Sequence, residues 1–174
     1  MKPCPERTIW SSSFSAGSDP ILQHTFPRPA AHYGGVIALF RPTRREALSV
    51  FALGAAGYPL LEVCWRGRTH ASMALAGGLA FLWIFREHAA RRPLWARCLR
   101  GALGVTGMEL AFGLVLNRAL RLGVWDYSRR RWNLLGQICP GYTALWCLLC
   151  AALSPVCRLL RLYFSRRRVY NRRY

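Results

Sequence analysis

The chain has almost no lysine and few acidic residues. Its 174 residues include 25 lysines and arginines against 7 aspartates and glutamates, which gives a formal net charge of +18. Lys2 is the only lysine. Because the Walker A motif G-x-x-x-x-G-K-[ST] needs a lysine beside the bound phosphates, the chain cannot carry this nucleotide site. We therefore expect that it does not hydrolyse ATP by itself.

The sequence also lacks common motifs of enzymes and metal sites. It has no G-x-S-x-G nucleophile motif, no H-E-x-x-H zinc motif and no G-x-G-x-x-G dinucleotide motif. The pair Cys147-x-x-Cys150 has no histidine or second pair nearby, so it lacks the other ligands of a zinc site. We expect no metal, no cofactor and no catalytic residues.

A large share of the chain is apolar. Hydrophobic residues make up 53% of it and charged residues 18%, and the mean hydropathy is +0.13. A chain that is both strongly basic and apolar must separate its arginines from long apolar stretches, as membrane proteins do. This pattern argues against a nucleic-acid-binding protein, a disordered chain and a disulfide scaffold. The expected partner is therefore the lipid bilayer and not a nucleic acid.

Four apolar stretches alternate with arginine-rich segments. A helix needs roughly 20 apolar residues to cross a bilayer. The last stretch, Trp132–Cys157, contains no charged side chain, and the first and third contain one glutamate each. The sequence predicts an all-α fold, an integral membrane bundle of four transmembrane helices over residues 46–158. The helices are expected at about residues 47–65, 69–86, 100–118 and 133–157.

The segments on either side of this bundle differ in composition. Residues 1–45 mix proline, serine and glycine without a regular period, which indicates a disordered tail or a start codon placed too far upstream. Residues 159–174 form a basic tail that we expect to contact anionic lipid headgroups. Most cations lie in the terminal segments and the second loop, so the positive-inside rule places both termini in the cytoplasm. We expect a multi-pass protein of the cell membrane.

Polar residues gather at one end of the predicted bundle, and Glu109 alone lies deeper, inside the third helix. The candidates for a solute or proton path are Glu62, Glu109, Asn117, Asn133 and Gln137. The candidates for an entrance or for ion pairs are Arg66, Arg68, His70 and Asp126. Since these residues come from separate segments of the chain, their convergence is the strongest functional signal in the sequence.

Glu109 lies in the middle of the third predicted span. A charged side chain there costs about 3 kcal/mol on insertion scales, so it must face the protein interior and find a partner. It is either a site for a proton or cation, or half of a structural pair with an arginine or Tyr58. Glu62 lies closer to the membrane surface, and Arg66 one turn later is its expected ion-pair partner.

The start of the fourth predicted helix carries a further polar pair. Asn133 and Gln137 would lie one turn apart on one helical face. Pro140 would then remove a helical hydrogen bond and leave an exposed carbonyl beside Gln137. Broken helices of this kind line cavities in membrane transporters. Asp126, in the loop before this helix, either caps the local backbone or binds a ligand.

Several sequence blocks carry a family resemblance. They are Leu61–His70, Trp125–Ser128 and Asn133–Pro140, followed by Tyr142-Thr143 and Leu145-Trp146. Together they resemble the bacterial CmpB-type ABC transporter permease family, over about Ala47 to Leu153. The resemblance implies an integral membrane protein that forms the permease part of an ATP-driven importer or exporter. It also implies a separate ATP-binding subunit.

The leading hypothesis is therefore a permease-like transport subunit. One alternative is a self-contained proton-coupled transporter that acts as a dimer, with Glu109 as the coupling acid. Another is a membrane enzyme that uses the glutamate, histidine and arginine cluster on a lipid or envelope precursor. A third is a structural subunit of a membrane complex. Because four short helices enclose only a thin pore, we expect a homo- or hetero-oligomer.

Overall fold

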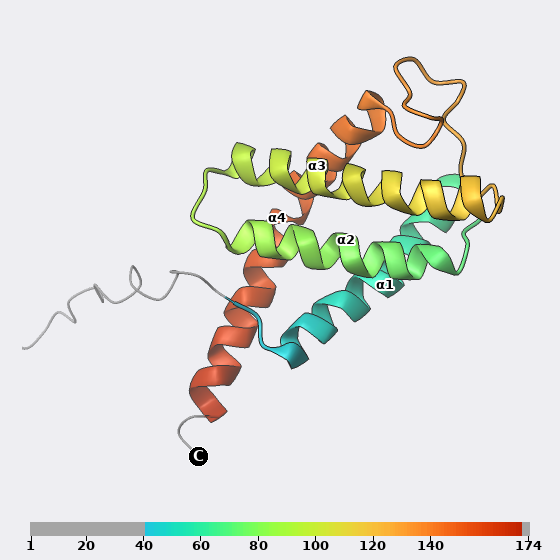
Figure 1. The fold of residues 1–174 in the computed structure, drawn as a ribbon. Coiled ribbons are helices and arrows are strands. Elements are labelled where there is room, and N and C mark those ends of the chain that lie inside the picture. Colours follow the sequence, from blue (N-terminus) through green and yellow to red (C-terminus); the bar gives the residue numbers. More distant parts are fainter. Residues whose placement is uncertain (1–40, 172–174) are drawn as a thin grey trace, which may run out of the picture. The chain divides into compact units, whose positions relative to one another are not determined.

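The computed structural model describes residues 41–171, and this part of the chain is all-α. Its four helices are α1 (Arg44–Arg66), α2 (Ser72–Ala89), α3 (Leu94–Gly113) and α4 (Pro140–Asn171), and a π-helical segment, η2 (Leu114–Ala119), directly follows α3 (Figure 1). The predicted all-α class and the four helices are thus confirmed. Most of the tail predicted for residues 1–45 lies outside the described residues.

Local sequence signals set both ends of α1. At its start the Thr43 hydroxyl accepts a hydrogen bond from the Glu46 N–H (3.4 Å), and the Glu46 carboxylate accepts one from the Thr43 N–H (2.8 Å). This capping box satisfies N–H groups that have no partner in the first helical turn. At its end Gly67 has a φ of +72°, a left-handed conformation that glycine adopts without strain. The chain therefore leaves α1 in a sharp turn towards α2.

Three helical segments of the described chain are long and apolar enough to cross a membrane, by length and composition: Arg44–Arg66, Leu94–Ala119 and Pro140–Asn171. The protein is thus a multi-pass membrane protein. The last turns of α2 carry Arg86, Glu87 and His88, which lower its hydropathy. It also buries more of its residues than the other helices and packs against α1, α3 and α4. The fourth span, expected at residues 69–86, stays a prediction.

The fourth predicted helix starts and ends later than the sequence indicated. It was expected over residues 133–157, but it begins at Pro140 and continues to Asn171. Residues 133–139 form a compact loop instead, in which Leu135 and Gly136 have positive φ angles of 55° and 69°. A proline at the first helical position loses no hydrogen bond, so Pro140 begins the helix and does not break it. Residues 159–171 of the predicted basic tail are helical as well.

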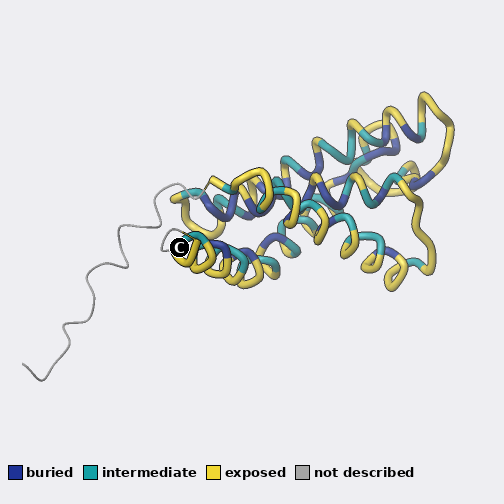
Figure 2. The backbone as a smooth tube through the Cα atoms, turned by 90° about the horizontal axis from the view of Figure 1, so that it is seen from below, coloured by how far each residue is buried: buried dark blue, intermediate teal, exposed yellow. Residues whose placement is uncertain are grey.

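Small residues allow a close contact between α1 and α2. A Cβ atom at Gly54 of α1 would lie 2.5 Å from both the Gly77 carbonyl oxygen and the Phe81 Cβ of α2, so no larger residue fits. The main buried cluster joins all four helices and consists of Val50, Ala80, Ile84, Phe85, Cys98, Val105, Cys150, Cys157 and Phe164. Figure 2 shows buried residues alternating with exposed ones along the helices. The cysteines of the described chain are all free, and those in this cluster pack as small apolar residues.

The segment η2 continues α3 with a wider turn. The Leu120 N–H donates to the Val115 carbonyl oxygen (2.9 Å), five residues back, whereas an α-helix would bond four residues back. The Leu122 N–H reaches the Leu116 carbonyl (2.9 Å), and the helix ends there. This widening places Asn117 beside the loop that leads to α4.

Candidate functional site

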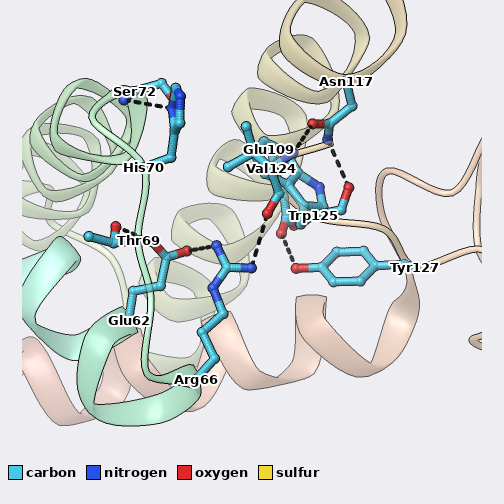
Figure 3. Close-up of polar contacts among 10 residues, drawn as sticks. All are labelled: Glu62, Arg66, Thr69, His70, Ser72, Glu109, Asn117, Val124, Trp125 and Tyr127. Atoms are coloured by element: carbon cyan, nitrogen blue, oxygen red, sulfur yellow. Dashed lines mark hydrogen bonds and ion pairs between the residues drawn. The ribbon is translucent and has the colours of Figure 1, made fainter. Parts of the chain in front are cut away.

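Glu62 and Arg66 form an ion pair in the last turn of α1, as their spacing predicted (Figure 3). The Thr69 hydroxyl donates a hydrogen bond to the other carboxylate oxygen of Glu62. Arg66 also donates to the Val124 carbonyl oxygen (3.3 Å), which ties α1 to the loop after η2. Glu62 is only 8% exposed, so its charge depends on these partners. The Nε of Arg66 is buried and has no hydrogen-bond partner among the described residues.

Glu109 lies half-buried on α3 and accepts hydrogen bonds from two aromatic side chains. The Tyr127 hydroxyl donates to one carboxylate oxygen (2.8 Å; Figure 3), and the Trp146 Nε1 donates to the other (3.2 Å). None of the ion pairs in residues 41–171 includes Glu109. Its hydrogen-bond partners in this part of the chain are thus Tyr127 and Trp146, and not the arginine or Tyr58 of the structural pair, which was one of the two interpretations of the sequence.

Tyr127 lies in the loop between η2 and α4. Burial raises the pKa of its phenol, and the neighbouring Glu109 carboxylate raises it further. The hydroxyl therefore stays protonated and remains a donor. The Tyr127 ring stacks on the ring of Tyr142 at the start of α4, with their centroids 4.3 Å apart. These contacts fix the donor in front of the carboxylate.

Both glutamates line one small cavity of about 50 Å³, together with Tyr58, Arg66, Tyr127 and Trp146. A space of this size holds a few water molecules. A larger open groove of about 580 Å³ runs between α1 and α4 and shares Tyr58, Glu62, Arg66, Tyr127 and Trp146 with the cavity. Its other lining residues are mostly apolar: Leu61, Cys64, Trp65, Tyr142, Leu145, Leu148, Leu149 and Ala152. The cavity that both glutamates line and the apolar groove on the helix surface thus share part of their walls.

Asn117 and Gln137 meet, but they line neither of these spaces. The Asn117 amide donates to the Gln137 side-chain oxygen (2.8 Å). It also donates to the Trp125 carbonyl (3.0 Å) and accepts from the Val124 N–H (2.7 Å) (Figure 3). The Trp125 indole N–H donates to the Gln137 carbonyl (3.1 Å). Gln137 is 6% exposed and packs against Gly113 of α3. These bonds hold the loop that carries Tyr127 against the end of α3.

The remaining candidates lie at the surface of the same region. Asp126 accepts hydrogen bonds from the Ser128 N–H (2.8 Å) and hydroxyl (2.9 Å), which lower the pKa of its carboxyl, so it caps the local backbone. Asn133 donates to the carbonyls of Ser128 (3.0 Å) and Arg130 (2.8 Å) inside the loop, and not from a helical face. His70 is exposed and contacts Ser72 (2.8 Å; Figure 3), and Arg68 is exposed. None of these four side chains lines the cavity.

Sequence reasoning missed the residues that complete the cavity. Tyr127 and Trp146 lie in the blocks Trp125–Ser128 and Leu145-Trp146, which carried the family resemblance, but nothing in their spacing from Glu109 pointed to contact. Thr69 was assigned no role, although it bonds to Glu62. Within residues 41–171, no three histidine, cysteine, aspartate or glutamate side chains gather in a way that could hold a metal ion.

Comparison with known proteins places this chain in a family. The model of the family described as "Putative ABC-transporter type IV" matches residues 72–169, from the start of α2 to near the end of α4. The match includes Glu109, Tyr127 and Trp146, whereas Glu62 and Arg66 precede it. No curated protein and no solved structure matches the chain. Because the match spans more than half of the 174 residues, the chain belongs to the family described as Putative ABC-transporter type IV.

Proposed function

We propose that the chain is a permease-like transport subunit of the cell membrane and that a separate subunit binds ATP and supplies the energy. The observation that carries this proposal is the cavity between four helices that both Glu62 and Glu109 line. Membership of a transporter family supports it. The absence of a Walker A lysine supports the separate subunit. In this proposal the chain is not itself an enzyme.

The solute path runs through the cavity, past Glu62 and Glu109. Arg66 lies at its mouth, and its buried Nε can donate to a passing acceptor. Asn117 and Gln137 act indirectly, because they position the loop that carries Tyr127. Asn133 and Asp126 stabilise the same loop, and Arg68 and His70 lie at the outer surface.

The arrangement in the membrane follows from the charge pattern. In this proposal α2 crosses the bilayer as a fourth span, and both termini lie in the cytoplasm. The arginines after residue 158 contact anionic lipid headgroups. Since the described cavity holds only a few water molecules, a wider path requires a second copy or a partner chain.

A proton-coupled transporter is the second candidate, and the surroundings of Glu109 favour it. Its hydrogen-bond partners are neutral, so the carboxylate can take up a proton without breaking an ion pair. In this version the chain works as a dimer, and Glu109 is the coupling acid.

Co-purification distinguishes the two candidates. The tagged chain is isolated from its native host in a mild detergent, and mass spectrometry identifies proteins present in stoichiometric amount; an untagged strain is the control. We expect an ATP-binding subunit with a Walker A lysine. A clean homo-oligomer would contradict the ATP-driven proposal. The purified oligomer would then be reconstituted into vesicles, where proton coupling requires that Glu109→Gln abolishes proton uptake measured with a pH-sensitive dye.

A further inference from the structure

A second charged cluster lies at the opposite end of α2 from the cavity. His88, near the end of α2, is fully buried, and its Nδ1 donates to the Ile84 carbonyl oxygen (3.0 Å). Arg97, in the first turn of α3, donates to the His88 carbonyl oxygen (3.2 Å). On α4, the Nε of Arg161 donates to the Cys157 carbonyl oxygen (3.4 Å). Ile84, Cys98 and Cys157, which adjoin these three side chains along the helices, pack together in the main buried cluster. Three helices thus bring cationic or titratable side chains close together.

These side chains are close enough to interact electrostatically. Arg161 experiences the positive charges of Arg97 and Arg158, and His88 experiences those of Arg97 and Arg161. Like charges gathered at partly buried positions destabilise a structure unless an anion lies near them. The Nε of Arg97 is buried and has no hydrogen-bond partner among the described residues. A negatively charged group near this cluster would therefore stabilise it.

The ion pairs and side-chain hydrogen bonds of the carboxylates in residues 41–171 involve residues other than His88, Arg97, Arg158 and Arg161. The pairs are Glu46 with Arg168, Glu62 with Arg66, Glu87 with Arg100, Glu109 with Tyr127 and Trp146, and Asp126 with Ser128. The ion pairs of the described chain do not include Arg97, Arg158 or Arg161. The anion is therefore expected from outside this part of the chain.

The position of the cluster in the membrane indicates the kind of anion. α4 has 32 residues and is about 48 Å long, whereas the apolar core of a bilayer is about 30 Å thick, so its arginine-rich end extends into the headgroup layer. Trp95, two residues before Arg97, is 70% exposed, as expected for an aromatic side chain at the membrane surface. At this depth phosphate groups are the abundant anions. The guanidinium fork matches their oxygens with paired N–H donors.

We infer that Arg97 and Arg161, with Arg158 at the rim and His88 beneath them, form a binding site for one phosphate group. The group belongs either to a phospholipid headgroup or to free phosphate on the cytoplasmic side. Bound between α3 and α4, it neutralises the repulsion between their arginines. The site rests on the proposed orientation, with both termini in the cytoplasm, but it is independent of the transported solute and of the energy source.

Lipid titration of the full-length protein tests this site. The protein is purified, stripped of lipid in detergent and titrated with dioleoyl phosphatidylglycerol, and native mass spectrometry measures the occupancy of the first bound lipid. We expect one lipid to bind before the others. The double variant Arg97→Gln/Arg161→Gln should lower the affinity for this first lipid about tenfold. A parallel titration with inorganic phosphate identifies the source, because free phosphate as the ligand would displace the lipid at equal concentration.

The matched control is Arg91→Gln/Arg92→Gln, which removes the same charge from exposed positions in the loop between α2 and α3. If both double variants lost lipid affinity equally, general charge attraction would explain the binding and the inference would be overturned. So would a wild-type protein that binds neither the lipid nor inorganic phosphate. Arg97→Gln also removes a bond to α2, so Arg161→Gln alone is measured as well. The Arg161→Gln variant loses only a hydrogen bond within its own helix and should still have a lower affinity for the first bound lipid.

Discussion

Tyr127 donates the shorter of the two side-chain hydrogen bonds to Glu109. We expect Tyr127→Phe to lower the free energy of unfolding by about 2 kcal/mol, because it leaves a half-buried carboxylate oxygen without its donor while the ring still stacks on Tyr142. Unfolding in mixed micelles, followed by tryptophan fluorescence, measures the change. Tyr163→Phe, at a 57% exposed position, is the control and should leave stability unchanged.

The ion pair between Glu62 and Arg66 is a second test at the level of single residues. Glu62→Ala should destabilise the protein by about 3 kcal/mol, because Arg66 is left partly buried without its counter-ion. Arg66→Ala should have a comparable effect. In the same unfolding assay, the double variant should lose less free energy of unfolding than the two single variants lose together. Additive losses would mean that the two charges do not stabilise one another.

These two glutamates also show how far residue patterns predict contacts. Glu62 and Arg66 are four residues apart on a helix, and local geometry alone brings such side chains together. Glu109 and Tyr127 are separated by η2 and an irregular loop, so no spacing rule connects them. Their contact depends on the bonds of Asn117 and Gln137, which fold the loop back onto α3. The sequence indicated that these polar residues converge, but not which of them touch.

At the level of helices, the contact between α1 and α2 depends on glycine at one position. Gly54→Ala should lower the free energy of unfolding by about 1–3 kcal/mol, because its Cβ would press against the Gly77 backbone. Gly57→Ala on the same helix meets nothing within 4 Å. This control should be neutral or slightly stabilising, since alanine favours a helix. Equal effects of the two substitutions would show that the close approach contributes no stability.

Helix boundaries were less predictable than the helices themselves. The uncharged run before Cys157 reads as one long helix, because a loop and a span can have the same apolar composition. The loop at 133–139 depends on backbone angles, including a positive φ at Leu135, that leucine rarely adopts and that composition does not reveal. Pro140 was an ambiguous signal, since proline either starts a helix or breaks one.

At the level of the whole molecule, the number of spans is open to direct measurement. If α2 crosses the membrane, the exposed loops on either side of it face opposite compartments. We expect a membrane-impermeant thiol reagent to label Arg68→Cys in intact cells, and to label Arg92→Cys only after permeabilisation. Wild-type protein gives the background from native cysteines. Labelling of both variants from the same side would exclude α2 as a span, and the reversed pattern would invert the orientation.

The wide turn of η2 makes α3 one residue longer than a regular helix ending at the same place would be. Its i to i+5 hydrogen bond contains one residue more than an α-helical bond, so this segment is equivalent to a single-residue insertion. Deleting one residue from Leu114–Ala119 would let the helix close as regular α. Side chains on both sides of the deletion, Glu109 included, would keep their positions, because the wide turn already absorbs the extra residue. The same deletion within the regular helix Leu94–Gly113 would instead turn everything after it by about 100° around the helix axis. The segment Leu114–Ala119 is therefore a place where the helix can lose one residue without changing the register between Glu109 and the loop that carries Tyr127.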